Sequence, residues 1–578
     1  MKSIIRYAVL YCALALSAAG AQARPGDDLV GLWGSESTVG PQLRGELILS
    51  FDAGTWRARL GGYEASSAAK GDSVRLEFPG NTGVFRGRLR PTDAEIHAFW
   101  IQPPGNLVAF ATPVTLQRTA RNVWRGAVVP LDDHISMYLL VRRDSAGNLI
   151  GAFRNPEFNF TGRAAWFRVA RNGDKLELTD PATGRQRFRQ QYDSSERRIV
   201  MDFGSLIGLT PHTREQAVGF FARTSQEPYV YRAPLPSNDG WRTARASAVG
   251  LDEARLRSLV QSILDADPVA ISAPRIHSVL VARRGTLVLE EYFRGYSGDR
   301  PHDLRSASKT FTSIMAGVAV DQGKLSPSAP ISRLFAHDSA SGDPRRRQIT
   351  LEHLLTHTSG MACDDNDDNS PGNEEVMQNQ TKQIDWYRYF LELPVAHDPG
   401  TLYAYCSAGM NLAGGVVSRA TSTWLPAFFD QYLARPLGIT HYAMNLTPTG
   451  EGYAGGGVHM LPRDLLKFGQ LFLDGGTWHG QRIVSKDWVE KSTANRTKGL
   501  NATDGLAWHR NTITADGQKH EGYEANGNGG QFLIVVPDLQ LAVVFTAGNY
   551  GQYQVWGKFR DELTPRFIFP TRASATTK

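Results

Sequence analysis

Apolar and polar residues alternate along the first half of the chain in short runs, which Gly, Asp and Asn separate. The runs with a two-residue period are 43–51, 55–60, 73–78 and 83–89. Such a period places alternate side chains on opposite faces of a strand, and the close spacing of the runs is typical of antiparallel strands. The pattern from about Asp28 to Arg232 therefore predicts an all-β barrel or sandwich.

The pattern changes after a segment rich in proline and polar residues at 233–240, which reads as a linker. An amphipathic helix is predicted over 251–266, and a long helical stretch occupies the middle of the second half. The apolar runs that predict strands are 277–282, 286–293, 532–536 and 541–546. Strands at both ends with helices between them indicate an α+β domain whose terminal strands share one sheet.

The first 23 residues have the composition of a secretory signal. Lys2 and Arg6 precede an apolar run that is too short to span a bilayer comfortably, and small residues surround Gln22. We expect cleavage after Ala23 and a periplasmic or secreted product without stable membrane insertion. The predicted organisation is a signal peptide at 1–23, a β-rich domain at 24–235, an α+β domain at 236–570 and a disordered tail at 571–578.

Composition narrows the classes of partner. Of the 578 residues, 41% are apolar, which is ordinary for a globular protein. Loss of Lys2 and Arg6 with the signal leaves 61 of the 63 basic residues against 57 acidic ones, a formal net charge of +4. These charges are interspersed and form no Lys/Arg block, so no nucleic-acid partner is expected.

Candidate chemistry lies in Ser306-Ala307-Ser308-Lys309. Residues three apart share a helix face, so Lys309 can reach the Ser306 hydroxyl and take its proton. A lysine does so only when its amine is neutral for part of the time, which requires burial or nearby positive charge to lower its pKa. The apolar run 311–320 predicts a buried helix with Lys309 in its first turns. A second match, Ser67-Ala68-Ala69-Lys70, lies among turn residues with no such helix behind it.

Further motifs accompany this tetrapeptide. They lie at 349–360, 399–407, 455–457, 463–465 and 475–478. Because of these motifs, the segment from Trp241 to Pro570 resembles the class C-like branch of the serine β-lactamase and penicillin-binding-protein superfamily. The resemblance implies that residues 236–570 form a serine β-lactamase/transpeptidase-like α+β domain, a β-lactamase-related serine hydrolase that uses no metal and no organic cofactor.

The resemblance also implies a role for each site residue. Ser306 attacks a carbonyl carbon and becomes acylated, while Lys309 and Tyr405 handle the protons, and which of the two is the general base stays open. Segment 528–531 corresponds to the family's Lys/His-Thr/Ser-Gly strand, so the backbone N–H groups of Ser306 and Gln531 are the expected oxyanion hole. The residues implied to contact substrate are Ser407, Asn528, Gly529, Gly530 and Gln531.

Two of these positions depart from the family pattern. Ser407 replaces the asparagine of the Tyr-x-Asn element, and neutral Asn528 replaces a lysine or histidine that would attract a substrate carboxylate. We therefore expect hydrolysis of esters or amides, from a small-molecule or peptide substrate, with weak β-lactam hydrolysis. The alternatives are a D-alanyl-D-alanine carboxypeptidase and a non-catalytic module that binds peptidoglycan or a partner. For the β-rich domain, three roles stay open: it gates substrate, it binds a partner, or it is a passive structural element.

Three remaining features concern metals and redox state. His353 and His357 have the i, i+4 spacing of metal ligands but lack the glutamate of zinc proteases, so a structural role is expected. The acidic run 364–369 lacks the glycine and final glutamate of an EF-hand, which favours a solvated loop over a calcium site. Cys363 and Cys406 remain after signal removal, and the resemblance places both beside the active site. It implies a disulfide between them, with two buried free thiols as the alternative.

Overall fold

The computed structural model describes residues 24–40, 43–68, 71–103, 108–157, 166–202, 206–335 and 342–570. The predicted signal peptide and C-terminal tail lie outside these residues, as do Ala69 and Lys70 of the second Ser-x-x-Lys match. Within the described ranges, no helix has both the length and the apolar character needed to cross a membrane. The chain forms two compact units, of which the first contains Leu139–Ala152 and Trp166–Pro211 together with the chain up to Trp33.

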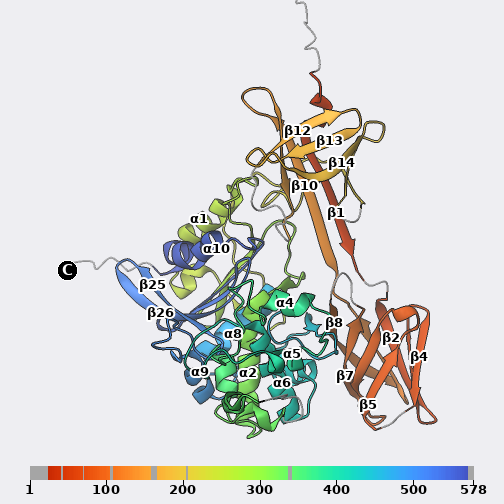
Figure 1. The fold of residues 1–578 in the computed structure, drawn as a ribbon, viewed down its shortest axis with the longest axis vertical. Coiled ribbons are helices and arrows are strands. Elements are labelled where there is room, and N and C mark those ends of the chain that lie inside the picture. The colour runs from red at the N-terminus through yellow and green to blue at the C-terminus, as the bar shows by residue number, and fades with distance from the viewer. Residues whose placement is uncertain are drawn as a thin grey trace, which may run out of the picture. The chain divides into compact units, whose positions relative to one another are not determined.

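A closed β-barrel is the first element of the N-terminal region, labelled by strands β1, β10 and β12–β14 in Figure 1. Its strands, in spatial order, are β1 (Gly31–Val39), β10 (Asp133–Arg143), β11 (Leu149–Arg154), β12 (Phe167–Asn172), β13 (Lys175–Thr179), β14 (Gln186–Asp193), β15 (Arg198–Asp202) and β16 (Leu206–Pro211). Buried and exposed residues alternate along β13 and β15, and Trp33 packs edge-on against Tyr192 with ring centroids 5.9 Å apart. Because the barrel is closed, each of its strands pairs with a neighbouring strand on both sides.

A second antiparallel array belongs to the larger unit. Its N-terminal strands are β2 (Gly45–Asp52), β3 (Thr55–Leu60), β4 (Tyr63–Ala68), β5 (Ser73–Glu77), β6 (Val84–Arg88), β7 (Glu95–Gln102), β8 (Ala109–Ala120) and β9 (Val123–Val128). Trp56, Trp100 and Trp124 are buried in its core. The prediction of an all-β N-terminal region is confirmed, and the predicted strand runs fall within one or two residues of β2, β3, β5 and β6.

Strand β8 continues this sheet into the C-terminal region. It pairs antiparallel with β21 (Tyr442–Leu446), and Ala111 lies opposite Met444. Strands β22 (Val458–Met460) and β20 (His302–Asp303) extend the same sheet beyond β21. Beside this junction the ring of Phe99 packs edge-on against Trp424 at 5.2 Å, so apolar contacts accompany the backbone pairing.

The α+β domain is built on a sheet with the order β17-β19-β18-β28-β27-β26-β25. These strands are β17 (Arg242–Thr243), β18 (Ile276–Arg283), β19 (Thr286–Tyr292), β25 (His509–Ala515), β26 (Gln518–Gly527), β27 (Gln531–Val536) and β28 (Leu541–Ala547). The helices are α1 (Glu253–Leu264), α2 (Lys309–Asp321), α3 (Leu351–Leu355), α4 (Glu374–Asn379), α5 (Trp386–Glu392), α6 (Ser407–Thr421), α7 (Leu425–Phe429), α8 (Pro462–Leu473), α9 (Lys486–Thr493) and α10 (Tyr553–Lys558). The predicted pairing of the first and last strands is confirmed, because β18 lies beside β28.

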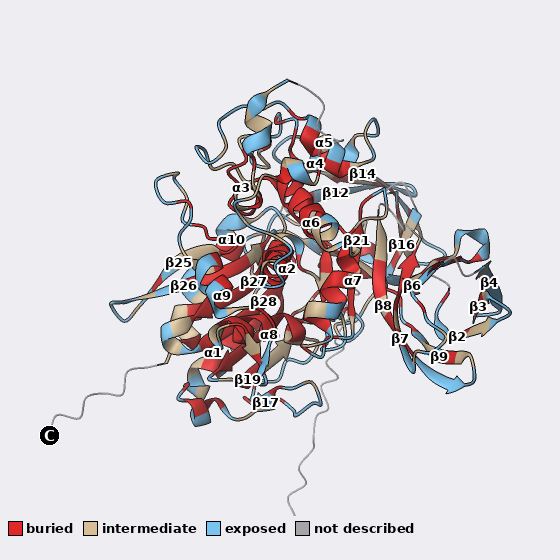
Figure 2. Ribbon diagram, turned by 90° about the horizontal axis from the view of Figure 1, so that it is seen from below, coloured by how far each residue is buried: buried red, intermediate tan, exposed pale blue. Residues whose placement is uncertain are grey.

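Both faces of this sheet are covered. In β27, Phe532 and Ile534 contribute to the core shared with α1, while Leu533 and Val535 contribute to the core shared with α8 and α2. Figure 2 shows the buried residues concentrated along β27, β28, α2 and α8. Burial on both faces explains why these strands read in the sequence as continuous apolar runs without alternation.

Candidate active site

The candidate nucleophile lies in a short turn at the start of a buried helix. Residues Arg305–Ser308 form a 3₁₀ turn, and Lys309 is the first residue of α2. Lys309 Nζ donates a hydrogen bond of 2.8 Å to Ser306 Oγ and a second one of 2.5 Å to the Gly455 carbonyl. The lysine side chain is buried, whereas Ser306 is partly exposed. The structure therefore places Lys309 where the sequence predicts it.

The electrostatic environment of Lys309 differs from the expectation. Burial acts to lower the pKa of its amine, but the Tyr405 oxygen and the carboxylates of Glu374 and Asp365 raise it, and the net pKa lies above its ordinary value. Lys309 is therefore an ammonium at neutral pH. The structure does not support the lowered pKa that would let this lysine act as the general base.

Tyr405 precedes α6 and lies against both Lys309 and His357. Lys309 Nζ is 4.9 Å from the centre of its ring, and the His357 ring centroid is 4.6 Å away. The backbone N–H of Cys406 donates to His357 Nδ1 at 3.1 Å. Burial and the nearby Lys309 cation lower the pKa of His357 to about 3, so this imidazole is neutral and serves as an acceptor that holds the Tyr405 loop.

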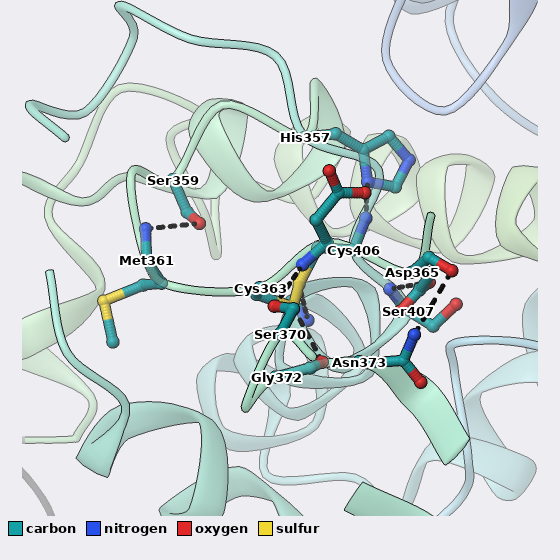
Figure 3. Close-up of a disulfide and its surroundings, with 12 residues drawn as sticks. His357, Ser359, Met361, Cys363, Asp365, Ser370, Gly372, Asn373, Cys406 and Ser407 are labelled. Atoms are coloured by element: carbon teal, nitrogen blue, oxygen red, sulfur yellow. Dashed lines mark hydrogen bonds between the residues drawn. A yellow bond between two sulfur atoms is a disulfide. The ribbon is translucent and has the colours of Figure 1, made fainter. Parts of the chain in front are cut away.

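A disulfide joins Cys363 to Cys406, with Cα atoms 5.5 Å apart (Figure 3). Asp365 reinforces this link, because its Oδ2 accepts the Ser407 backbone N–H at 2.8 Å and its own N–H donates to the Tyr405 carbonyl at 2.8 Å. The acidic run 364–369 is therefore not simply a solvated loop, since its residue Asp365 also holds the segment that contains Tyr405. Sequence reasoning missed Asp365 because the pattern carries no signal for a contact with residues 40 positions away.

Strand β26 lies against the nucleophile turn. The residues lining a small cavity at Ser306 are Ser306, Lys309, Thr310, His357, Asp504, Ala507, His509, Ala525 and Asn526. Gly527 ends the strand, and a Cβ built on it would lie 2.4 Å from the Leu304 carbonyl oxygen and 3.2 Å from Ala307 N. The absence of a side chain at Gly527 is therefore what allows β26 to approach the Ser306 turn.

The predicted substrate segment 528–531 is not among the residues that line this cavity. The Asn528 side chain is exposed and accepts the Gly551 N–H at 2.8 Å, while buried Gln531 donates through its amide to the Ala547 carbonyl at 2.7 Å. Gly529 and Gly530 have φ of +100° and +99° and form the turn between β26 and β27. The glycines form this turn, and the cavity-lining residues of β26 are Ala525 and Asn526, three and two positions before Asn528.

Ser407 is also placed differently from the expectation. Its side chain is completely buried at the start of α6, and Ser407 Oγ has no hydrogen-bond partner among the described residues. It is absent from the residues that line the cavity. Its contact with substrate therefore stays a prediction.

A carboxylate–imidazole pair that the sequence did not single out faces the cavity. His509 Nδ1 lies 3.0 Å from Asp504 Oδ1, and the Tyr403 hydroxyl donates to Asp504 Oδ2 at 2.7 Å. The ring of His509 lies 6.2 Å from that of Tyr405. No motif of the sequence relates Asp504 to His509, because an isolated β-bridge brings them together.

His353 has a structural role. Its Nδ1 accepts the Thr350 N–H at 3.2 Å and completes the N-terminal cap of α3, so it does not share a site with His357. Across the part of the chain that the structure describes, no group of three or more His, Cys, Asp or Glu side chains is arranged to hold a metal ion.

The C-terminal region is similar in sequence to known proteins. The family model described as Beta-lactamase matches residues 275–554. The 6-aminohexanoate-dimer hydrolase of Paenarthrobacter ureafaciens is 29% identical over 233 residues, which cover 39% of this chain and 58% of that protein. Acyltransferase mokF of Monascus pilosus is 32% identical over 164 residues, covering 26% of this chain and 39% of that one.

Among solved structures, a penicillin-binding protein homolog from Caulobacter crescentus is 15% identical, with a TM-score of 0.42 over 52% of this chain and 93% of that chain. The match to the curated hydrolase spans little more than half of that relative's length.

Proposed function

Because residues 275–554 form a domain of the Beta-lactamase family, we propose that the protein is an exported serine acyl hydrolase that forms an acyl-enzyme on Ser306. The observation that carries the proposal is the 2.8 Å hydrogen bond from Lys309 Nζ to Ser306 Oγ beside a cavity. The names of the matched relatives, a dimer hydrolase and an acyltransferase, are consistent with acyl transfer to a serine.

The charge state of Lys309 favours Tyr405 as the general base. An ammonium carries no lone pair, so it cannot accept the Ser306 proton, but it can stabilise negative charge on Ser306 Oγ and on the Tyr405 oxygen. We assign the proton of Ser306 Oγ to the Tyr405 oxygen as the bond from Oγ to the carbonyl carbon forms. The same proton then passes to the leaving alcohol or amine.

The proposed substrates are esters or amides without an obligatory carboxylate, and β-lactam hydrolysis is weak. The β26 residues that line the cavity, Ala525 and Asn526, carry no charge. The guanidinium of Arg305, next to Ser306, is already paired with Asp303 at 2.8 Å. A substrate carboxylate would have to compete with Asp303, which disfavours the terminal carboxylate of a D-alanyl-D-alanine peptide and that of a penicillin.

Two observations support export of the protein. The first 23 residues have the composition of a signal peptide, and the Cys363–Cys406 disulfide is the kind of cross-link that persists in an oxidising compartment. Secretion of the mature chain with an N-terminus at Arg24 would test this part of the proposal.

Covalent labelling tests the nucleophile. A fluorophosphonate probe is expected to add once to the wild-type protein, on Ser306, and not at all to Ser306→Ala. The matched control is Ser67→Ala, because Ser67 is a partly exposed residue of β4 and begins the other Ser-x-x-Lys match. Labelling of Ser306→Ala at the wild-type level would show that another residue is the nucleophile, whereas no labelling of the wild type would favour a non-catalytic binding module.

Substrate profiling tests the proposed class. We expect kcat/KM for a short-chain p-nitrophenyl ester to exceed that for a chromogenic cephalosporin and for a D-alanyl-D-alanine peptide measured on the same sample. A cephalosporin or peptide value well above the ester value would instead indicate a lactamase or a carboxypeptidase.

A further inference from the structure

Asp504 and His509 form an acid–base pair beside the nucleophile, separate from Lys309 and Tyr405. Both line the cavity that contains Ser306 Oγ. Lys309 reaches this cavity from α2 and Tyr405 from the segment before α6, whereas His509 is the first residue of β25. The pair thus belongs to a part of the chain different from those that carry Lys309 and Tyr405.

The pair is held rigidly. A β-bridge joins the backbones of Asp504 and His509, the Asp504 N–H donates to Thr497 Oγ1 at 2.8 Å, and the Tyr403 hydroxyl donates to Asp504 Oδ2. Asp504 is only 7% exposed. Because a carboxylate only accepts hydrogen bonds, the contact with Asp504 Oδ1 places the proton of a neutral His509 on Nδ1. Nε2 is then the nitrogen able to accept a proton.

The proposed reaction has a second half in which such a group can act. Once Ser306 is acylated, a water molecule must lose a proton as it attacks the ester, and the Lys309 ammonium cannot take that proton. An imidazole oriented by a buried carboxylate is suited to this task near neutral pH. We propose that Asp504 and His509 form a second catalytic dyad, which activates the water that hydrolyses the acyl-enzyme. This inference rests on the proposed function of Ser306.

His509 Nε2 accepts a proton from water while the water oxygen bonds to the acyl carbon, and Asp504 stabilises the resulting imidazolium. Collapse of the tetrahedral intermediate breaks the bond from that carbon to Ser306 Oγ. The proton on Nε2 then passes to Ser306 Oγ, which frees the carboxylic acid and restores the enzyme.

Several charged or titratable groups surround the imidazole. Burial acts to lower the pKa of His509, but the hydrogen bond and charge of Asp504 and the Glu524 carboxylate raise it, against an opposing effect of Lys309. His357, Tyr403 and Tyr405 also lie nearby, and the net pKa of His509 lies above its ordinary value. Deacylation should therefore accelerate as the pH rises through this raised value, where the imidazole becomes neutral.

Burst kinetics with a p-nitrophenyl ester separate the two half-reactions. For His509→Gln we expect a full burst of one nitrophenol per enzyme, followed by steady-state turnover slower by ~100-fold or more, the size of a general-base contribution. Mass spectrometry should show the acylated Ser306 peptide accumulating in this variant.

His520→Gln is the matched control. His520 makes a similar contact with a carboxylate, Asp538, but neither residue lines the Ser306 cavity. Its deacylation rate should equal that of the wild type.

Asp504→Asn supplies a second readout if His509→Gln folds poorly. Loss of the carboxylate should shift the pH profile of deacylation to lower pH and reduce its plateau. Deacylation of His509→Gln at the wild-type rate, or an equal loss of burst and turnover, would overturn the dyad while leaving Ser306 as nucleophile. Failure of the wild type to acylate Ser306 at all would overturn the proposed function as well.

Discussion

At the scale of single residues, sequence pattern located the candidate active-site groups but not their charge states. Ser306, Lys309 and Tyr405 lie together, because a helical turn joins Ser306 to Lys309 and the disulfide-linked segment before α6 holds Tyr405 against Lys309. The raised pKa of Lys309 depends on the Tyr405 oxygen and on two carboxylates far away in the sequence, those of Glu374 at the start of α4 and Asp365 in the segment before it. Carboxylates placed by tertiary contacts reversed the expected direction of the shift, and no spacing in the sequence indicates such a contact.

His357 provides a residue-scale test in pH-dependent stability. Its pKa in the folded protein is about 3, below the ordinary value of 6.5, so the unfolded chain takes up the proton first on acidification. Stability is therefore lost as the pH falls below 6.5, by about 2 kcal/mol for this group between pH 7 and pH 5, at 1.36 kcal/mol for each unit of difference.

Urea unfolding at the two pH values measures this effect. His357→Gln should lose about 2 kcal/mol less than the wild type between pH 7 and pH 5, because it lacks the titrating group. Equal losses for His357→Gln and the wild type would show that His357 does not titrate as its burial implies.

At the scale of elements, glycines next to the Ser306 turn have two different roles. Gly529 and Gly530, predicted to contact substrate, have positive φ and form the turn between β26 and β27. The close approach is made by Gly527, whose φ is ordinary and whose role follows only from the Leu304 carbonyl beside it. Sequence shows that a glycine is present, whereas only the packed structure shows which one a neighbour requires.

Gly527→Ala should therefore impair catalysis. The new methyl group would meet the Leu304 carbonyl oxygen at 2.4 Å and force β26 away from the Ser306 turn. A displacement on the order of 1 Å can cost about 100-fold in rate, so we expect a loss of kcat/KM of that order with a folded protein by circular dichroism. Gly298→Ala is the control, since its Cβ would make only an ordinary contact of 3.4 Å with Tyr292. Wild-type activity of Gly527→Ala would contradict the close-approach argument.

The disulfide-linked loop gives a second prediction at this scale. Thiol titration of the denatured, unreduced mature protein should find no free thiol, because Cys363 and Cys406 are bonded. The bond closes a loop with a sequence separation of 43 residues, and its removal in Cys363→Ala/Cys406→Ala should cost about 2–4 kcal/mol of stability. Since Cys406 follows Tyr405 directly, kcat should fall together with stability. Two titratable thiols in the unreduced protein would rule the bond out.

At the scale of the molecule, the sequence separated a β-rich half from an α+β half but gave no sign of how a sheet joins them. The pairing of β8 with β21 connects residues more than 330 positions apart, and Phe99, Ile101, Ala111 and Leu446 form a small apolar cluster at the junction. Alternation predicts strands in the N-terminal half, but the partner of each strand is chosen by side-chain packing in three dimensions. The N-terminal sheet is thus continuous, through β21 and β22, with β20, the strand just before the Ser306 turn.

This continuity predicts that the N-terminal sheet and the catalytic region unfold together. Phe99→Ala removes the contact with Trp424, and Leu76→Ala truncates the sheet core away from the junction; each buried truncation should cost about 2–5 kcal/mol. Both variants should lower the temperature at which esterase activity is lost, in step with a single calorimetric transition, while Tyr63→Ala at an exposed position should leave it unchanged. If Leu76→Ala instead splits the transition and leaves the temperature of activity loss at its wild-type value, the sheet and the catalytic region are energetically independent despite the shared strands.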